Sequence, residues 1–300
     1  MALSTKIIKK RIRSIGNTKK ITKAMEMVSA VKMRKAVTAV LASRDYAGTA
    51  WSLVLGLAQR VKPEDHPLLN RREPVKKIGV ILISANRGLC GGFNSQIISQ
   101  AIQYAKNQSA EIEWITVGKK GADFLAKNGQ RVVAEFEKPD LITGTAEILA
   151  LARLVIKDYL NNNYDKVILT YTDFYSTMVQ KPKIRQLLPF EPTSESDLGS
   201  IGENKTPANQ ANFEIFEYIF EPNKTEILNQ FLPRLVEIQL YQALLESAAS
   251  EHSARMLTMK NATNAAADMI DELTLAFNQA RQAAITKEIA EITGSKAALE

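Results

Sequence analysis

The chain has 300 residues, of which 45% are hydrophobic, and a formal net charge of +7. This composition supports a core of ordinary size in one or two domains and excludes a disordered or collagen-like chain. A single cysteine excludes an internal disulfide and a multi-cysteine metal site, and two histidines are too few for a metal or acid–base cluster. Because there is no apolar run of about twenty residues and no apolar signal core at the start, we expect a cytosolic chain that reaches a membrane only through partners.

The positive charge is concentrated near the N-terminus. Residues 1–35 contain eleven lysines and arginines against Glu26 alone, which gives +10 and leaves −3 for the rest of the chain. A basic helix can meet nucleic acid, an anionic membrane or an acidic protein surface, or its lysines can simply coat a solvated face. The stretch has no aromatic residue for base stacking, so a nucleic-acid-binding coiled coil is the weaker alternative.

The first element is predicted to be one long helix from about Ser4 to Gln59, ended by Pro63. Its apolar stripe has an apparent break at Gly16 and moves around the axis after Val28. We expect the helix to continue through both irregularities, because a glycine inside a helix costs only about 1 kcal/mol. The predicted stripe comprises Ile8, Ile12, Ile15, Ile21, Met25, Val28, Met33, Val37, Val40, Ala47, Trp51, Val54 and Ala58.

The middle of the chain alternates short aliphatic runs with helical stretches, which indicates βαβ units and a mainly parallel, doubly wound sheet. The predicted strands are 77–84, 111–117, 130–136 and 165–170, and the predicted helices are about 94–107, 119–128 and 145–162. The runs 177–188 and 213–220 are predicted to add antiparallel edge strands. Between these two runs, the segment 191–211 is rich in polar residues, proline and glycine, which predicts a long exposed loop.

The last element is a second long helix, predicted for about 225–293. Asn223 and Glu226 have the spacing of a capping box, Pro233 should kink the helix or split off a short first segment, and Gly294 should end it. Its seam follows a 4-3-4-3 spacing, which keeps one face against a partner helix. The seam comprises Met256, Met259, Thr263, Ala266, Ile270, Leu273, Phe277, Ala280 and Ala284.

The natural partner of this seam is the helix at the other end of the chain. The predicted fold is therefore α/β: a long antiparallel coiled coil of the N- and C-terminal helices, with a central doubly wound, Rossmann-like domain. We predict three parts, with boundaries at 1–62, 75–222 and 223–300.

A glycine-rich turn follows the first predicted strand and precedes a helix, where phosphates commonly bind. The turn contains Arg87, Gly88, Cys90, Gly91 and Gly92. Its spacing matches neither a dinucleotide fingerprint nor a P-loop, so a nucleotide-binding enzyme is the weaker alternative to a structural turn or a protein-binding surface. A catalytic role for Cys90 is disfavoured because no histidine or paired acid lies nearby in sequence to activate it.

Four motifs together resemble the gamma subunit of F-type ATP synthases, over essentially the whole chain. They are ITKAMEMVSA with KMRK at 21–35, RGLCGGFN at 87–94, ESAASEHSARM at 246–256 and ARQAAITKEI at 280–289. The resemblance implies a non-catalytic rotor stalk without cofactor, whose coiled coil stands inside a hexamer of alpha and beta subunits. It also implies that the α/β domain sits on the ring of c subunits beside epsilon, with one copy per complex, and that ion flow turns the ring and this stalk together.

The resemblance also suggests site residues. Those expected to contact beta or the hexamer are Met25, Lys20, Lys23, Lys32, Glu251, Arg255, Arg281, Gln282, Thr286 and Glu288. The glycine-rich turn is expected to be structural or to face epsilon and the c-ring. From spacing alone, Glu251 and Arg255 predict an ordinary i,i+4 ion pair worth a few tenths of a kcal/mol, and the polar residues after Ala280 could equally form a solvated helix face.

The chain lacks the cysteine-containing insertion of the plastid form, so we expect no thiol switching. With no transit peptide in the sequence, we expect a bacterial subunit, peripheral to the cytoplasmic face of the plasma membrane.

Overall fold

A computed structural model of the chain describes residues 5–58, 66–140, 142, 144–190 and 223–297. Within these ranges, the side chains of 44–58, 224 and 294–297 are not described. The predicted strand 213–220 and the predicted loop 191–211 lie outside the described residues. The same holds for the side chains of Ala47, Trp51, Val54 and Ala58.

The central element is a five-stranded mixed sheet with strand order β3-β2-β1-β4-β5. The strands are β1 (Lys77–Ile83), β2 (Glu111–Val117), β3 (Val132–Phe136), β4 (Lys166–Phe174) and β5 (Gln180–Leu188). The first four are parallel and β5 is antiparallel to β4, which confirms the predicted parallel sheet and its antiparallel edge strand. β1 lies in the middle and is buried on both faces, as its continuous aliphatic run predicts.

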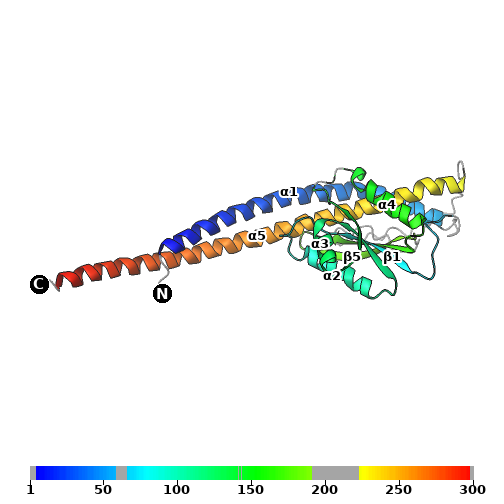
Figure 1. Ribbon diagram of the computed structural model, residues 1–300. Helices are drawn as coiled ribbons and strands as arrows, with labels where there is room; N and C mark the ends of the chain where they lie inside the picture. The colour runs from blue at the N-terminus through cyan, green and yellow to red at the C-terminus, as the bar shows by residue number, and fades with distance from the viewer. Residues whose placement is uncertain (1–4, 59–65, 141, 143, 191–222, 298–300) are drawn as a thin grey trace. The chain divides into compact units, whose positions relative to one another are not determined.

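Helices cover both faces of this sheet (Figure 1). They are α2 (Phe93–Lys106), α3 (Lys119–Lys127) and α4 (Leu149–Leu160), the last preceded by the 3-10 turn η2 (Thr145–Ile148). Residues of α2 and α3 pack with Val80 and Leu82 of β1 on one face, whereas α4 packs with Ile81 and Ile83 on the other. This alternation along β1 confirms the doubly wound arrangement.

Two long helices complete the fold: α1 (Thr5–Ala58, 54 residues) and α5 (Lys224–Ala297, 74 residues), about 80 and 110 Å long at 1.5 Å per residue. The backbone N–H of Glu226 donates to Asn223 Oδ1 at 2.8 Å, which confirms the predicted cap. Pro233 lies inside this continuous helix, so of its two predicted effects the separate short first helix is excluded. The predicted end at Gly294 was wrong, because α5 continues to Ala297.

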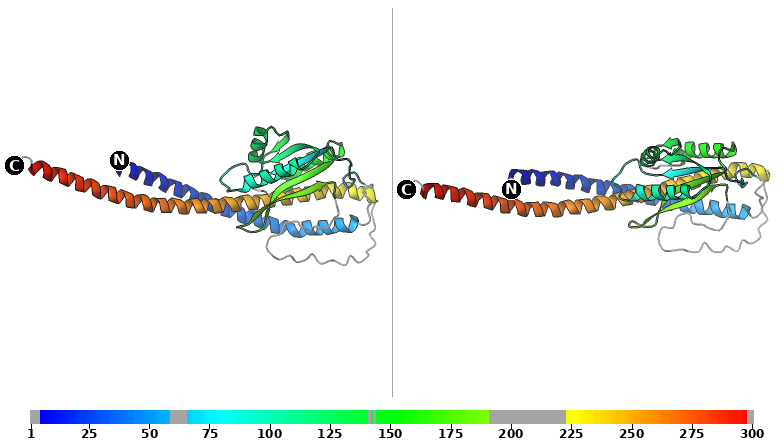
Figure 2. Two further views of the ribbon diagram at one scale, coloured as in Figure 1. Left: turned by 90° about the horizontal axis from the view of Figure 1, so that it is seen from below. Right: turned by 60° about the horizontal axis from the view of Figure 1, so that its bottom comes forward.

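The chain divides into two compact units, each described separately below. The shaft unit comprises residues 1–29 and 256–300, and the sheet unit comprises 30–255. In the sheet unit, the early part of α5 lies along the α4 face of the sheet (Figure 2). Leu232, Leu235 and Val236 belong to the same core as β1 and α4. The sheet domain therefore uses part of α5 as one of its covering helices.

Candidate functional site

In the shaft unit, α1 and α5 pack through a heptad seam. The seam positions of α1 are Thr5, Ile8, Ile12, Ile15, Lys19, Thr22, Glu26 and Ser29, all buried or half-buried. On α5, Met259, Thr263 and Ala266 are buried, and the Oγ1 atoms of Thr22 and Thr263 lie 2.8 Å apart in a hydrogen bond. This pairing of the first and last helices confirms the predicted helix pair.

The predicted stripe of α1 was wrong at Ile21 and Val28, whose side chains are 60% and 55% exposed. A seam that continues from Ile15 with 4-3 spacing reaches Lys19 and Thr22, not Ile21. The register of the helix pair therefore decides which residues are buried. The seam continues past Gly16, but its next residues, Lys19 and Thr22, are polar, and this change from aliphatic to polar residues looked like a break in the sequence.

At the other end of this seam, Ile270, Leu273, Phe277 and Ala280 are half-buried as predicted, but Ala284 is exposed. The register of the antiparallel pair explains this difference. Thr22 faces Thr263, so Thr5, seventeen positions before Thr22, faces Ala280, seventeen positions after Thr263. Thr5 is the first described residue of α1, and Ala284 therefore lies beyond the described part of that helix. Every described side chain from Arg281 to Thr293 is exposed, so Arg281, Gln282, Thr286 and Glu288 all lie on the solvated end of α5.

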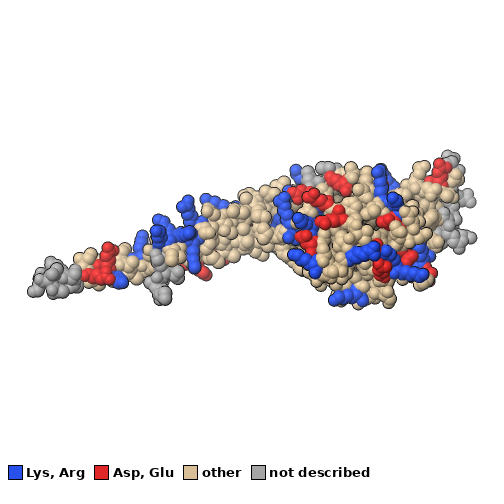
Figure 3. All heavy atoms as spheres, viewed as in Figure 1, with Lys and Arg blue, Asp and Glu red and all other residues tan. Residues whose placement is uncertain are grey.

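The basic residues of α1 that were expected to meet a partner lie mostly at its surface. Lys20 is exposed, Lys23 bonds to Glu26 at 3.1 Å, and Met25 beside them is half-buried. Lysine and arginine side chains gather along this N-terminal part of α1 (Figure 3). In the sheet unit, Lys32 forms an ion pair with Asp140 at 3.3 Å.

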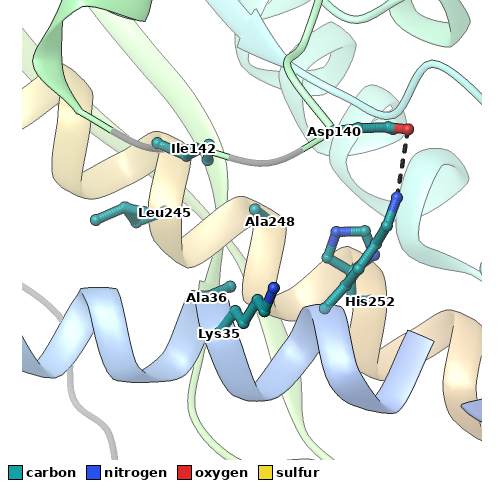
Figure 4. Close-up of a pocket in the computed structure, with 8 residues that line it drawn as sticks. Lys35, Ala36, Asp140, Ile142, Leu245, Ala248 and His252 are labelled. Carbon is teal, nitrogen blue, oxygen red and sulfur yellow. Dashed lines mark ion pairs between the residues drawn. The ribbon is translucent and has the colours of Figure 1, made fainter. Parts of the chain in front are cut away.

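That ion pair borders a small cavity of about 40 Å³ between α1, α5 and the segment after β3. Lys35, Ala36, Asp140 and His252 line it (Figure 4). Burial lowers the pKa of His252 to about 4, so its imidazole is neutral at pH 7 and contributes no charge to the cavity. The cavity is large enough for a few water molecules and too small for a nucleotide.

Also in the sheet unit, α5 holds the glycine-rich turn through an arginine. Arg255 donates from Nη2 to the carbonyl oxygens of Arg87 and Gly88 and from Nε to the latter, each at 3.4 Å. The turn itself contains Leu89 and Gly91 with positive φ angles of 62° and 56°. It therefore presents carbonyl oxygens to a guanidinium, whereas a phosphate would need N–H donors. This geometry supports the structural turn over the nucleotide site.

Arg255 is one member of a buried ionic triad, Lys138–Glu251–Arg255. The Nζ of Lys138 lies 2.8 Å from Glu251 Oε2, and Arg255 Nη2 lies 2.8 Å from Glu251 Oε1. The side chains are 3%, 10% and 11% exposed, respectively. Lys138 also donates to Ser247 Oγ at 3.2 Å. Each carboxylate oxygen thus has its own cation, which buried charges require.

This environment fixes the charge of Glu251. Burial on its own would raise the pKa of the carboxyl group, but the charges of Lys138 and Arg255 outweigh it and lower the pKa to about 2. Glu251 and Arg255 are thus more than the surface i,i+4 pair that their spacing indicates. Sequence reasoning missed Lys138, which is 113 residues from Glu251, and Asp140, because neither belongs to a recognisable motif.

Cys90 packs beside this triad with Ala85 and Phe93, and Asn94 Nδ2 lies 3.3 Å from its sulfur. Burial raises the pKa of the thiol despite the nearby charge of Arg255. The thiol is therefore protonated at pH 7 and a poor nucleophile. Among the described residues there is no cluster of three potential metal ligands, and no described helix combines the length and apolar character needed to cross a membrane.

Comparison with known proteins decides the family. The profile of the family described as ATP synthase matches residues 4–299. The ATP synthase gamma chain of Pelotomaculum thermopropionicum is 46% identical over 299 residues and 99% of both chains. That of Chloroflexus aurantiacus is 41% identical over 301 residues, again 99% of both. The chain belongs to the ATP synthase gamma chain family. It is accordingly a non-catalytic subunit of an ATP synthase.

Solved structures share the fold of this gamma chain family member. A chain in the central stalk and c-ring structure of Tetrahymena thermophila mitochondrial ATP synthase matches with a TM-score of 0.58 and 24% identity, covering 81% of this chain and 99% of that one. A chain in the rotor structure of the Euglena gracilis mitochondrial ATP synthase matches with a TM-score of 0.63 and 18% identity, covering 94% and 99%. At this identity, the likeness concerns the fold.

Proposed function

We propose that this gamma chain transmits rotation from the ring of c subunits to the catalytic hexamer of alpha and beta subunits and so couples ion flow to ATP synthesis. One observation carries the proposal: α5 is a single helix that packs on the sheet in one unit and pairs with α1 in the other. A continuous helix stiffened by a partner can pass torque along its length, whereas a flexible linker would dissipate it.

Torque must also pass from the sheet domain into α5 without slippage. The triad Lys138–Glu251–Arg255 supports this step, because it ties the segment after β3 and the glycine-rich turn to one stretch of α5. Glu251 and Arg255, expected at the hexamer, have their polar atoms engaged within the chain. We therefore propose that these two residues act on coupling by fixing the sheet domain to the helix.

The exposed residues of α1 and of the end of α5, together with the half-buried Met25 and Lys32, are the better candidates for the surface that meets the hexamer. We propose that Met25, Lys20, Lys23 and Lys32 meet an acidic loop of beta, and that Arg281, Gln282, Thr286 and Glu288 meet beta near the end of α5. The exposed charges of Lys20, Lys23, Arg281 and Glu288 give a screened and modest attraction, which suits a shaft that must turn. The outer side of the turn, near Leu89, is proposed to face epsilon or the c-ring.

The remaining proposals concern assembly and location. The full-length relatives are bacterial, which supports placing the chain at the cytoplasmic face of a bacterial plasma membrane, peripheral and held there through the c-ring. One copy per complex, with no nucleic acid partner, follows from its place on the rotation axis.

The test is made in the assembled synthase. Affinity capture of the tagged chain from a native membrane extract should return alpha and beta, each in threefold excess over it, together with epsilon and c. Replacing both Arg281 and Gln282 with alanine should slow ATP hydrolysis while leaving the subunit ratio unchanged. A captured chain without alpha and beta would contradict the proposed function.

A further inference from the structure

A second buried polar cluster lies in the sheet unit, where α5 packs against the end of β4, and the proposed function does not use it. Its members are Tyr171 and Asp173 of β4 with Gln242 and Glu246 of α5, all less than 10% exposed. Gln242 links the cluster to α1, because Ser43 Oγ donates to Gln242 Oε1 at 2.7 Å. The cluster thus connects three elements that must stay together.

Glu246 is the most deeply buried acid in this cluster, with no exposed surface. Its Oε1 accepts from Gln242 Nε2 at 2.8 Å, and the side chain of Tyr171 lies near the carboxyl group. Its Oε2 is buried and has no donor among the described residues, and no described cation lies within ion-pair distance. A buried carboxylate in this setting would be costly, whereas a protonated carboxyl group is tolerated.

Asp173 can accept this proton, because its side chain lies close enough to Glu246 for its negative charge to raise the pKa of that carboxyl group. Asp173 has a cation of its own, since Lys183 Nζ of β5 lies 3.9 Å from its Oδ2. Arg185 of β5 adds a second positive charge near Tyr171. Lys183 balances the negative charge of Asp173, and a second negative charge on Glu246 would be repelled by the first.

We propose that Glu246 and Asp173 share one proton in the folded chain, and that losing this proton in mildly alkaline solution loosens α5 from β4. Burial and the charge of Asp173 raise the pKa of Glu246 to about 8, which places the loss just above neutral pH. The groups that face the carboxyl pair are Tyr171 of β4, Lys183 and Arg185 of β5 and Gln242 of α5. The pair titrates as a unit, so the proton belongs to both carboxyl groups.

The sign of the pH effect follows from proton linkage. Because the pKa of Glu246 is higher in the folded than in the unfolded chain, the stabilisation is complete below the unfolded pKa of about 4.3 and is lost as pH rises to about 8. Between these values the ratio of folded to unfolded chain should fall by up to about tenfold per pH unit from this pair. Above the folded pKa, this contribution should change no further.

The test compares the full wild-type chain with Glu246→Gln, using Glu272→Gln on the exposed part of α5 as the matched control. Urea unfolding at several pH values between 6 and 9 should show the fall in the wild type and in the control. The fall should be smaller in Glu246→Gln, which carries no titratable proton at this position. Equal pH dependence in all three chains would overturn the proposal.

Infrared spectroscopy keeps the proposal testable if Glu246→Gln fails to fold. Ordinary carboxyl groups are ionised at pH 6, so the folded wild-type chain should show the carbonyl band of a protonated carboxyl group that disappears by pH 10. Asp173→Asn, which removes the second carboxyl group, should shift the disappearance of this band to lower pH. A wild-type spectrum without the band at pH 6 would refute the shared proton.

Discussion

The replacement Glu251→Gln tests the buried triad most directly. It removes the one negative charge between Lys138 and Arg255, whose side chains are 3% and 11% exposed. Both ion pairs, each 2.8 Å long, are lost at once, and two cations remain buried beside each other. Breaking a buried pair by removing one partner typically costs about 3–5 kcal/mol, which corresponds to a loss of roughly 100- to 5,000-fold in the folded-to-unfolded ratio.

The assay is urea unfolding of the full chain at pH 7, with Glu291→Gln as the control. Glu291 makes the same kind of contact on the same helix, with Lys287 at 3.6 Å, but these side chains are 67% and 77% exposed. An exposed pair of this kind is worth less than about 1 kcal/mol, so the control should scarcely change the unfolding midpoint. If Glu251→Gln shifted the midpoint no more than Glu291→Gln, the triad would not hold the sheet unit together.

The same triad predicts an acid dependence. Because the pKa of Glu251 is lowered to about 2 in the folded chain, its stabilisation is present above the unfolded pKa of about 4.3 and is lost as pH falls towards 2. Wild type should therefore lose stability across this window more steeply than Glu251→Gln. Parallel pH curves below pH 5 would show that the carboxylate is not held by its two cations.

Three further predictions concern the shaft and the turn. Thr22→Val or Thr263→Val alone should cost about 0.5–1.5 kcal/mol in urea unfolding, because each removes the hydrogen bond between the two hydroxyls. The double replacement should cost less than the sum, since this one bond can be lost only once, and additive losses would count against it. Arg255→Ala should make the Cys90 thiolate react faster with a thiol reagent, because the turn loses its guanidinium clamp. Rates are compared per thiolate, since losing the charge of Arg255 by itself raises the pKa of the thiol, and an unchanged rate per thiolate would show that the clamp does not close the turn. Met25→Lys should reduce ATP-driven ion pumping more than ATP hydrolysis by adding an ion pair to beta, and an unchanged ratio of the two rates would remove Met25 from the proposed contact.

Local sequence patterns were sufficient to predict most elements of the fold. The aliphatic run of β1, its alternation with helices and the cap at Asn223 depend on residues close together in the chain. The edge strand β5 was also found, but β4 extends to Phe174, beyond its predicted end at residue 170. Its last four residues are two polar side chains between two aromatic ones, which interrupts the aliphatic run, and pairing with β5 keeps them in the sheet.

What the sequence did not reveal depends on register and on distant partners. Ile21 and Val28 suggested a core stripe because hydrophobicity alone does not specify which residues face the other helix. The buried Thr22 was missed because its partner is 241 residues away. In the same way, the sequence gives no sign that Glu246 is buried, because its burial depends on the packing of α5 against β4. The residues proposed to contact other subunits could be proposed only from the family resemblance, because an exposed charged residue does not by itself indicate which protein it binds.

The central claim is that the first and last helices turn as one rigid shaft. The measurement that tests it most directly uses Thr22→Cys with Thr263→Cys in a Cys90→Ser background, because the two threonine hydroxyls are 2.8 Å apart. Oxidation should join the two helices within one chain, and the assembled synthase should then hydrolyse ATP and pump ions as fast as its reduced form. Failure of the two cysteines to join, or loss of pumping when they do, would contradict a shaft in which these helices stay paired throughout the rotation.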